Sequence, residues 1–261
     1  MKGICNPPPE HALQGYDLAM PLLSNQRERL VQGMFDRIAG RYDRLNRVIS
    51  FHFDTLWRRQ AIKALGLKGT DGLVLDLGTG TGDFALAAAH GVGEKGKLFG
   101  LDFSPEMLRL AQQKRRKHPY GDKTAFILGS ALTPPFRSEA FDGIITAFVL
   151  RNITDLNLFF LEAFRLLRPG GKLASLEMFP PRSGLFSFFY SFYFYRIVPW
   201  IGGALAGDRS AYQYLSDSVR GFDSPEMIAD VIRMAGFGGV KIKRFFCGAV
   251  CLHVTEKPQG R

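Results

Sequence analysis

A glycine-rich run, DLGTGTGD, occupies residues 76–83 and stands where an apolar segment gives way to an amphipathic one. Glycines let the backbone turn sharply there, and the N–H groups at the start of the following helix can face an anionic or polar ligand group. Gly78, Gly80 and Gly82 follow a GxGxG spacing, whereas dinucleotide enzymes use GxGxxG. The run therefore predicts a nucleotide-type site, but a glycine loop alone does not select the ligand.

A carboxylate further along the chain narrows the choice of ligand for this site. Asp102 ends the next apolar run, KLFGLD, at a position where a carboxylate can accept hydrogen bonds from both hydroxyls of a ribose. This combination favours an adenosyl cofactor, and we favour S-adenosylmethionine over NAD, which the same geometry could serve. A purely structural glycine turn would leave Asp102 unexplained.

The elements that would position these residues follow from hydrophobic patterning. Between about residues 70 and 178, short apolar runs alternate with amphipathic segments. Such alternation is typical of βαβ units around a parallel sheet that is buried on both faces. Ser104 and Pro105 predict a helix start, because serine caps helix N-termini and proline suits the first helical position. The segment RPGG at residues 168–171 predicts a stop after a helix over residues 156–167.

One catalytic domain is expected over residues 26–261. Residues 1–25 carry prolines and scattered charges where a signal peptide needs a continuous apolar stretch, so we interpret them as a poorly ordered leader. Residues 26–70 show helical spacing and form an N-terminal helical entry segment. Residues 179–222 leave the βαβ rhythm as an aromatic helical insertion, after which a helix over residues 224–234 and two strands complete the domain.

Charge and cysteine content limit the partners. The formal net charge of +10 and the pI near 9.7 favour anionic binding partners, but they do not distinguish among nucleic acid, acidic lipid headgroups and a phosphorylated substrate. The three cysteines form no CxxC pair, and no histidine stands at a metal-ligand spacing, so the sequence predicts neither a disulfide framework nor a metal site. A reducing, cytoplasmic location is expected.

The glycine loop and Asp102 resemble those of class I methyltransferases, and further motifs resemble the menaquinone and ubiquinone biosynthesis C-methyltransferase family. These motifs are YDRLNRVIS at residues 42–50, LRNITD at 150–155 and RLLRPGGKLASLE at 165–177. The resemblance spans about residues 35–253. It departs from the family pattern at Leu45, Asp54, Ala147, Met178 and Phe179, and histidine is usual where Asp54 stands.

This resemblance implies a Rossmann-like α/β fold with a seven-stranded, mostly parallel sheet, helices on both faces and an antiparallel last strand. It also implies S-adenosylmethionine as the cofactor. At matching positions the glycine loop with Thr81 would hold the methionine moiety, Asp102 the ribose, and Ser130 with Ala131 the adenine edge. The expected cofactor-binding residues are Asp76, Gly78, Thr79, Gly80, Thr81, Gly82, Asp102, Phe103, Ser130, Ala131 and Ala147.

The implied reaction is C-methylation of a lipophilic prenylated quinol, with demethylmenaquinol favoured and a benzoquinol precursor of ubiquinone or another lipid or phenol as alternatives. A ring carbon attacks a sulfonium methyl when a neighbouring hydroxyl is ionised, and a phenol with a pKa of about 10 is mostly protonated at neutral pH. We predict that Arg151 stabilises the phenolate and that Asn152 orients a water or the hydroxyl. Tyr42 is a candidate for proton transfer.

Both catalytic assignments have structural alternatives. Arg151 could instead bind a carboxylate at the sheet edge, and Asn152 could begin the next helix through its side chain. Loops at the carboxyl ends of strands are where open α/β sheets bind ligands, which favours the catalytic interpretation.

The aromatic insertion suggests a membrane surface. Eight of the ten residues 186–195 are aromatic, and residues 185–206 are about as long as a membrane span with one charge, Arg196. Tyrosine, tryptophan, proline and arginine suit an interface better, so we interpret the insertion as a lid and lipid-facing entrance for a polyprenyl tail. We expect peripheral contact with the inner membrane face, with the basic run 114–117 attracting anionic lipids. A homodimer is left open.

Three other functions are considered as alternatives. A nucleic-acid methyltransferase would explain the charge, but the sequence shows no base-flipping motif and no appended RNA-binding module, so no nucleic-acid partner is expected. A lipid or sterol methyltransferase shares the fold and the cofactor. A non-enzymatic cofactor-binding scaffold could dispense with Arg151 and Asn152, and both are present.

Overall fold

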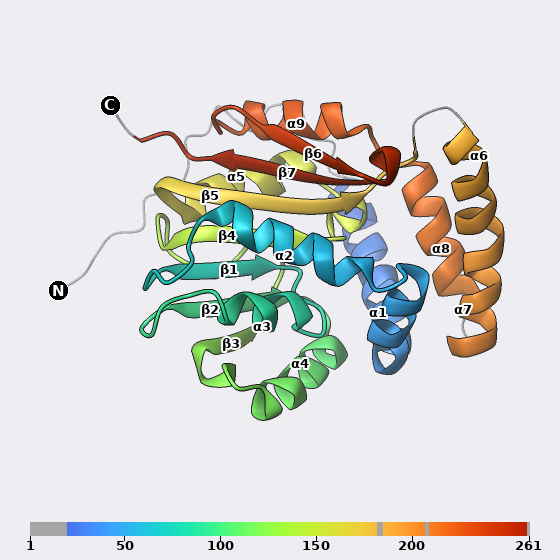
Figure 1. Ribbon diagram of the computed structural model, residues 1–261, viewed down its shortest axis with the longest axis horizontal. Coiled ribbons are helices and arrows are strands. Elements are labelled where there is room, and N and C mark those ends of the chain that lie inside the picture. The colour runs from blue at the N-terminus through green and yellow to red at the C-terminus, as the bar shows by residue number, and fades with distance from the viewer. Residues whose placement is uncertain (1–19, 182–184, 207–208, 260–261) are drawn as a thin grey trace.

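A central β-sheet flanked by helices makes up the protein, whose computed structural model describes residues 20–181, 185–206 and 209–259 (Figure 1). The leader expected over residues 1–25 lies outside the described residues as far as residue 19. Helix α1 (Met20–Ile49) takes in the rest of it and most of the entry segment.

The sheet has seven strands in the order β3-β2-β1-β4-β5-β7-β6. Strands β1 to β5 pair in parallel, and β7 runs antiparallel to both of its neighbours, which confirms the expected sheet. The strand order reverses between β1 and β4, and this is where open α/β sheets bind ligands at the carboxyl edge. The strands are β1 (Leu73–Leu77), β2 (Lys97–Asp102), β3 (Thr124–Leu128), β4 (Phe141–Ala147), β5 (Leu167–Met178), β6 (Lys241–Phe245) and β7 (Val250–Glu256).

Helices cover both faces of the sheet (Figure 1). On one face, α2 (Phe53–Leu65) and α3 (Asp83–Ala89) pack in an apolar cluster that includes Trp57 and Leu98. On the other, α5 (Leu156–Leu166) and α9 (Pro225–Met234) pack in a cluster that includes Phe159 and Ile228. Strands buried on both faces must be apolar throughout, which is why they appear as continuous apolar runs in the sequence.

The expected helix starts are confirmed by their caps, whereas the helix expected over residues 156–167 ends at Leu166 because β5 already begins at Leu167. The Ser104 Oγ accepts a hydrogen bond of 3.1 Å from the Met107 N–H at the start of α4 (Pro105–Lys117). Helix α5 is capped by Asp155, whose Oδ1 accepts from the Leu158 N–H at 2.9 Å. The idea that Asn152 begins this helix is therefore wrong: Asn152 lies in a separate 3-10 turn, η3 (Leu150–Asn152).

A helical cap stands beyond the carboxyl edge of the sheet (Figure 1). It contains α1, α6 (Leu185–Phe192), a π-helical turn (Tyr193–Ile197), α7 (Val198–Ala206) and α8 (Arg209–Arg220). Its own apolar cluster is built around Phe194, Val198 and Tyr212. Among the helices that the structure describes, none combines the length and apolarity that a membrane crossing needs.

Candidate functional site

The glycine loop between β1 and α3 is pinned to the end of β2. The N–H groups of Gly78 and Thr79 both donate to the Leu101 carbonyl, at 2.8 and 3.0 Å. A Cβ on Gly78 would stand 2.4 Å from a methyl carbon of Val149, and its φ of +73° is one that glycine adopts without strain. Gly80, in contrast, has open space where a Cβ would be. The loop therefore packs closely against Val149, which follows β4, and leaves open space beside Gly80.

Asp102 lies at the carboxyl end of β2 with its side chain beside this loop. Only 7% of the residue is exposed. Its Oδ2 accepts from the Gly80 N–H at 2.7 Å and its Oδ1 from the Ser104 N–H at 2.9 Å. Burial raises the pKa of this carboxyl to about 6. Because each carboxylate oxygen carries two lone pairs, Asp102 can still accept one hydrogen bond on each oxygen, as a ribose diol requires.

A cavity extends from Asp102 along the carboxyl edge. Seven of the eleven residues expected to bind the cofactor line it: Gly78, Gly80, Asp102, Phe103, Ser130, Ala131 and Ala147. Helix α1 and the turns after β3 and β4 complete the wall, and these residues were not among the expected cofactor contacts: Glu28, Val31, Phe35, Leu132, Val149 and Ile153.

The four other expected cofactor residues do not line the cavity: Asp76 lies on β1, and Thr79, Thr81 and Gly82 are parts of the loop that make contacts away from the cavity. Asp76 is 1% exposed and its Oδ2 accepts from the Thr79 Oγ1 at 2.8 Å, while burial raises its pKa to about 7. The Thr81 Oγ1 donates to the Asp43 Oδ1 at 2.6 Å, and so ties the loop to α1. A Cβ on Gly82 would stand 2.5 Å from the Phe126 ring. These residues hold the loop in shape.

A second, more apolar cavity of about 310 Å³ adjoins the first. Tyr42 and Phe148 line both cavities. Most of the remaining wall comes from aromatic and aliphatic side chains of the cap, of α2, of the end of β5 and of the β6–β7 turn. These are Ile49, Phe51, Phe53, Trp57, Met178, Phe189, Tyr190, Tyr193, Phe194, Leu215, Phe246, Ala249 and Val250. Its polar members are Tyr42, Asn46, Ser50, Asp54, Arg58 and Arg151. A molecule in this cavity would reach the first one past Tyr42 and Phe148.

Tyr42 stands where the two cavities meet. Its ring packs edge-on against Phe35 with centroids 5.9 Å apart. Burial raises the pKa of its hydroxyl, an effect that the nearby Arg151 partly opposes. Tyr42 is therefore a hydrogen-bond donor at neutral pH.

Arg151 lines the apolar cavity and is bound to a carboxylate that sequence reasoning missed. The Arg151 Nη1 donates to Glu177 Oε1 at 2.6 Å and to the Phe148 carbonyl at 2.9 Å. Glu177, on β5, is fully buried. The alternative that Arg151 binds a carboxylate is therefore borne out. The Arg151 Nε is buried and has no partner among the described residues. A buried glutamate inside an apolar strand is the sequence signal that could have identified this pair.

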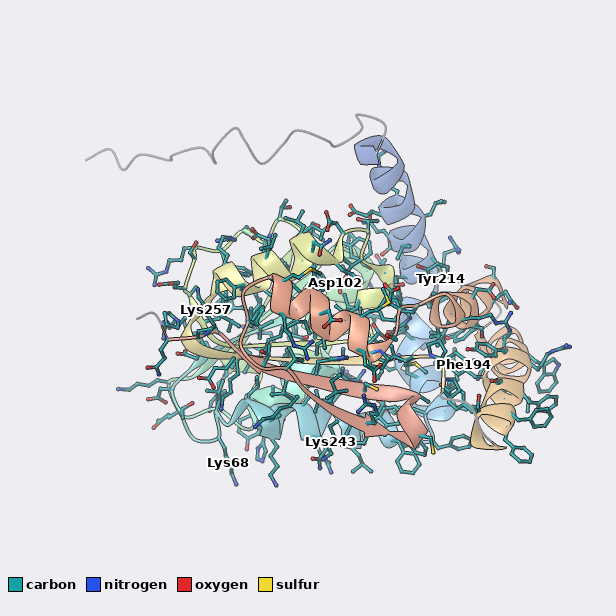
Figure 2. All side chains as sticks on the ribbon, turned by 90° about the horizontal axis from the view of Figure 1, so that it is seen from above. Lys68, Asp102, Phe194, Tyr214, Lys243 and Lys257 are labelled. Atoms are coloured by element: carbon teal, nitrogen blue, oxygen red, sulfur yellow. The ribbon has the colours of Figure 1, made fainter. Side chains whose placement is uncertain are left out.

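Asn152 points elsewhere than Arg151. It lines the cofactor cavity and not the apolar one. Its Oδ1 accepts from the Tyr214 hydroxyl on α8 at 3.0 Å, which joins the site to the cap. Tyr214 and Phe194 are labelled in Figure 2 on the helices of the cap.

Exposed aromatic rings gather around the apolar cavity. Phe51, Phe53, Phe189 and Phe246 line it and are nevertheless 67%, 39%, 61% and 40% exposed. The side chains of α6 and α7 project outward from the cap (Figure 2), and Phe188, Phe192 and Trp200 are 69%, 59% and 70% exposed. We call these seven side chains the aromatic rim. Within the rim, the rings of Phe188 and Phe189 lie 5.6 Å apart and those of Phe53 and Phe246 lie 4.9 Å apart.

The sequence matches a family of known enzymes. The sequence profile of the ubiE/COQ5 methyltransferase family matches residues 23–257. The chain belongs to this family. It is 40% identical to the demethylmenaquinone methyltransferase of Thermus thermophilus, over 86% of this chain and 100% of that one. It is 39% identical to a ubiquinone/menaquinone biosynthesis C-methyltransferase of Geotalea daltonii, over 87% and 96% of the two chains.

Solved structures agree with the fold. A SAM-dependent methyltransferase from Aquifex aeolicus superposes with a TM-score of 0.56 and 19% identity, over 77% of this chain and 89% of that one. This ubiE/COQ5 family member is an S-adenosylmethionine-dependent methyltransferase. The residues present suit that cofactor, because Asp102 keeps free lone pairs beside an open Gly80 and a cavity long enough to run from the loop to Ser130.

Proposed function

We propose that this methyltransferase methylates a ring carbon of a prenylated quinol, with demethylmenaquinol as the acceptor. The observation that carries the proposal is the pair of adjoining cavities, one against Asp102 and the glycine loop and the other apolar, with Tyr42 and Phe148 in both walls. The name of the Thermus thermophilus relative supports the same acceptor.

The apolar cavity suits the chemistry. S-adenosylmethionine, when bound, supplies a methyl group on a positively charged sulfur. Attack by a phenolate carbon on that methyl removes both charges, so the transition state is less polar than the reactants and a dry wall favours it. Phe148 and Trp57, together with the rings of the cap, provide that wall.

Arg151 would hold the quinol oxygen. Its charge is already balanced by Glu177, so it offers the quinol a directional N–H more than a net positive charge. A buried donor left without a partner costs about 1–3 kcal/mol, and a quinol oxygen would recover that free energy once the Arg151 guanidinium turns its Nε towards the cavity. Tyr42 can donate to the same oxygen from the cofactor side, while Asn152 would keep Tyr214 and the cap in place over the cofactor.

The remaining cofactor contacts are assigned by position. Asp102 would bind the ribose, Ser130 and Ala131 the adenine edge, and the loop around Gly80 the methionine moiety, because these residues succeed one another along one cavity.

The aromatic rim would rest on a membrane surface and let the polyprenyl tail pass from the lipid into the apolar cavity. Four of its rings line the cavity, so the entrance and the contact surface are continuous. The basic run 114–117 is not part of this surface: α4 is separated from α6 and α7 by α1 (Figure 1), and Lys114 is bound to Asp43 and Asp83. The attachment is therefore expected to depend on apolar insertion more than on this run.

A benzoquinol acceptor is the second candidate, because the Geotalea daltonii relative is named for both ubiquinone and menaquinone biosynthesis. The test is transfer of labelled methyl to chemically reduced demethylmenaquinone and, separately, to the reduced benzoquinone precursor, in detergent. We expect turnover of the naphthoquinol, with kcat lowered about 100-fold in Arg151→Ala and unchanged in Arg165→Ala, which removes an arginine paired on the outer helix α5. Turnover of neither quinol would contradict the proposal.

Flotation with anionic vesicles tests the membrane contact. We expect the wild-type protein to float and the Phe188→Ser, Phe192→Ser double variant to float less, because two exposed rings are lost. The matched control is Leu161→Ser, which changes a 51% exposed side chain on α5 outside the rim. Equal flotation of all three proteins would contradict a role for the rim.

A further inference from the structure

A stripe of polar side chains runs along the wall of the otherwise apolar cavity. Tyr42, Asn46, Ser50, Asp54 and Arg58 are spaced by four residues and all line the cavity. Residues four apart on a helix share one face, and the turn at residues 50–52 carries the stripe from α1 onto α2. The stripe begins at the junction with the cofactor cavity.

Asp54 is held firmly within this stripe. It is 3% exposed. Its Oδ1 accepts from the Ser50 Oγ at 3.0 Å, and its Oδ2 from the Arg58 Nη1 at 2.7 Å. Each oxygen retains a lone pair that no described group uses, so the carboxylate can accept from a ligand in the cavity without breaking either contact.

Asp54 is also the only carboxylate among the described residues of the cavity wall. That wall contains no histidine, lysine or cysteine either. Burial raises the pKa of the Tyr42 hydroxyl and raises that of Tyr190 as well, so these phenols hold their protons at neutral pH. Glu177 lies behind Arg151, outside the wall, and His52 is exposed and does not line the cavity. Within the described wall, one group can accept a proton without first losing one.

We propose that Asp54 accepts the ring proton that methylation displaces. This inference rests on the proposed quinol methylation. In the first step, a carbon electron pair of the phenolate forms the bond to the methyl group, and the pair of the broken C–S bond stays on sulfur. The methylated carbon then carries both a methyl group and a hydrogen. Asp54 takes that hydrogen as a proton, and the C–H electron pair restores the aromatic ring.

The ion pair with Arg58 explains how a carboxylate can be accommodated in such an apolar cavity. An unpaired buried charge would be costly, and the ion pair with Arg58 offsets that cost. The Arg58 Nε is buried with no partner among the described residues, so the pair is not saturated. The competing interpretation is that Asp54 serves only to neutralise Arg58, and the experiment must separate the two roles.

The experiment compares Asp54→Asn, Asp54→His and the double variant Asp54→Asn, Arg58→Gln with the wild type, using reduced demethylmenaquinone. We expect Asp54→Asn to lower kcat about 10²- to 10⁴-fold with little change in KM, as for the loss of a general base. The double variant should stay as slow. Asp54→His should regain part of the activity, because an imidazole can accept the proton. The control Glu162→Gln removes a carboxylate paired with Arg165 on α5 and should match the wild type.

A kinetic isotope effect tests the role directly. With quinol deuterated at the ring carbon, Asp54→Asn should turn over more slowly than with the protonated quinol, because proton removal has become limiting.

Binding measurements guard against simple misfolding. Asp54→Asn should bind S-adenosylmethionine as the wild type does, and menaquinone should still quench the fluorescence of Trp57, which lines the cavity. Recovery of activity in the double variant, or full activity in Asp54→Asn, would overturn the base role while wild-type turnover upholds the proposed function. Absence of wild-type turnover with either quinol would overturn the proposed function, and this inference with it.

Discussion

The cofactor cavity and the apolar cavity share a wall but are built in opposite ways. Around the cofactor cavity, the loop after β1 and the ends of β2 and β3 present backbone groups and short side chains, and hydrogen bonds such as that from Gly80 to Asp102 fix them. Around the apolar cavity, side chains from α1, α2, the cap and the β6–β7 turn meet through packing. The first should therefore be rigid and sensitive to single backbone changes, and the second more tolerant of changes in side-chain shape.

The largest effect is expected at Asp102. Asp102→Ala would remove the two hydrogen bonds that we propose for the ribose, each worth about 1.5–3 kcal/mol because the acceptor is charged, so affinity for S-adenosylmethionine should fall about 10³-fold. Calorimetric titration measures this. If the two cavities are energetically separate, menaquinone should still quench Trp57 in this variant, and loss of both ligands would contradict that separation.

Substitutions of Arg151 test the wall of the apolar cavity. Arg151→Ala leaves Glu177 buried and unpaired, so the free energy of unfolding should drop by about 3–5 kcal/mol. The double variant Arg151→Met, Glu177→Leu should regain most of that stability, because a buried ion pair can be replaced by apolar side chains, yet it should remain slow in methyl transfer. Thermal unfolding and turnover are measured together. Recovery of activity in the double variant would argue against the N–H role of Arg151.

Substitution of two glycines in the loop after β1 compares a position packed against a neighbouring side chain with a position that has open space around it. In Gly78→Ala the new methyl would meet Val149 at 2.4 Å, so the loop must shift, and affinity for the cofactor should fall with a cost of about 1–3 kcal/mol. Gly80→Ala meets no atom within 4 Å and should cost less, its φ of +55° being the remaining strain. Calorimetric titration of both variants with S-adenosylmethionine measures which of them loses more affinity. Equal losses would mean that conformation alone, and not the contact with Val149, governs the loop.

The smallest effect concerns pH. Because burial raises the pKa of Asp102 to about 6 in the folded protein, its carboxylate becomes protonated as pH falls through 6 and loses its acceptor capacity. Affinity for S-adenosylmethionine should then fall roughly tenfold for each pH unit below that value. The same raised pKa means that folded Asp102 binds protons more tightly than unfolded Asp102, so its contribution to stability decreases as pH rises through 6. An Asp102→Asn variant should show neither dependence.

Much of the cofactor half was predictable from the sequence. The glycine run, the carboxylate at the end of β2 and the Ser104 cap each act over a few residues, so local spacing carries their signal. The alternating apolar runs indicated the sheet for the same reason. Family motifs identified Arg151 and Asn152, which no local pattern explained.

Only the tertiary structure decided which of these residues meet. The sequence alone determined the elements, the nucleotide-type loop and the aromatic character of the cap, because each depends on neighbours in the chain. That Glu177 binds Arg151, that Asn152 turns to Tyr214, and that Asp54 is the one carboxylate in the described cavity wall depends on segments far apart in sequence. Contacts of that kind are fixed by packing across the sheet edge. The spacing by four from Tyr42 to Arg58 indicates a shared helical face, but it does not indicate that this face lines a cavity.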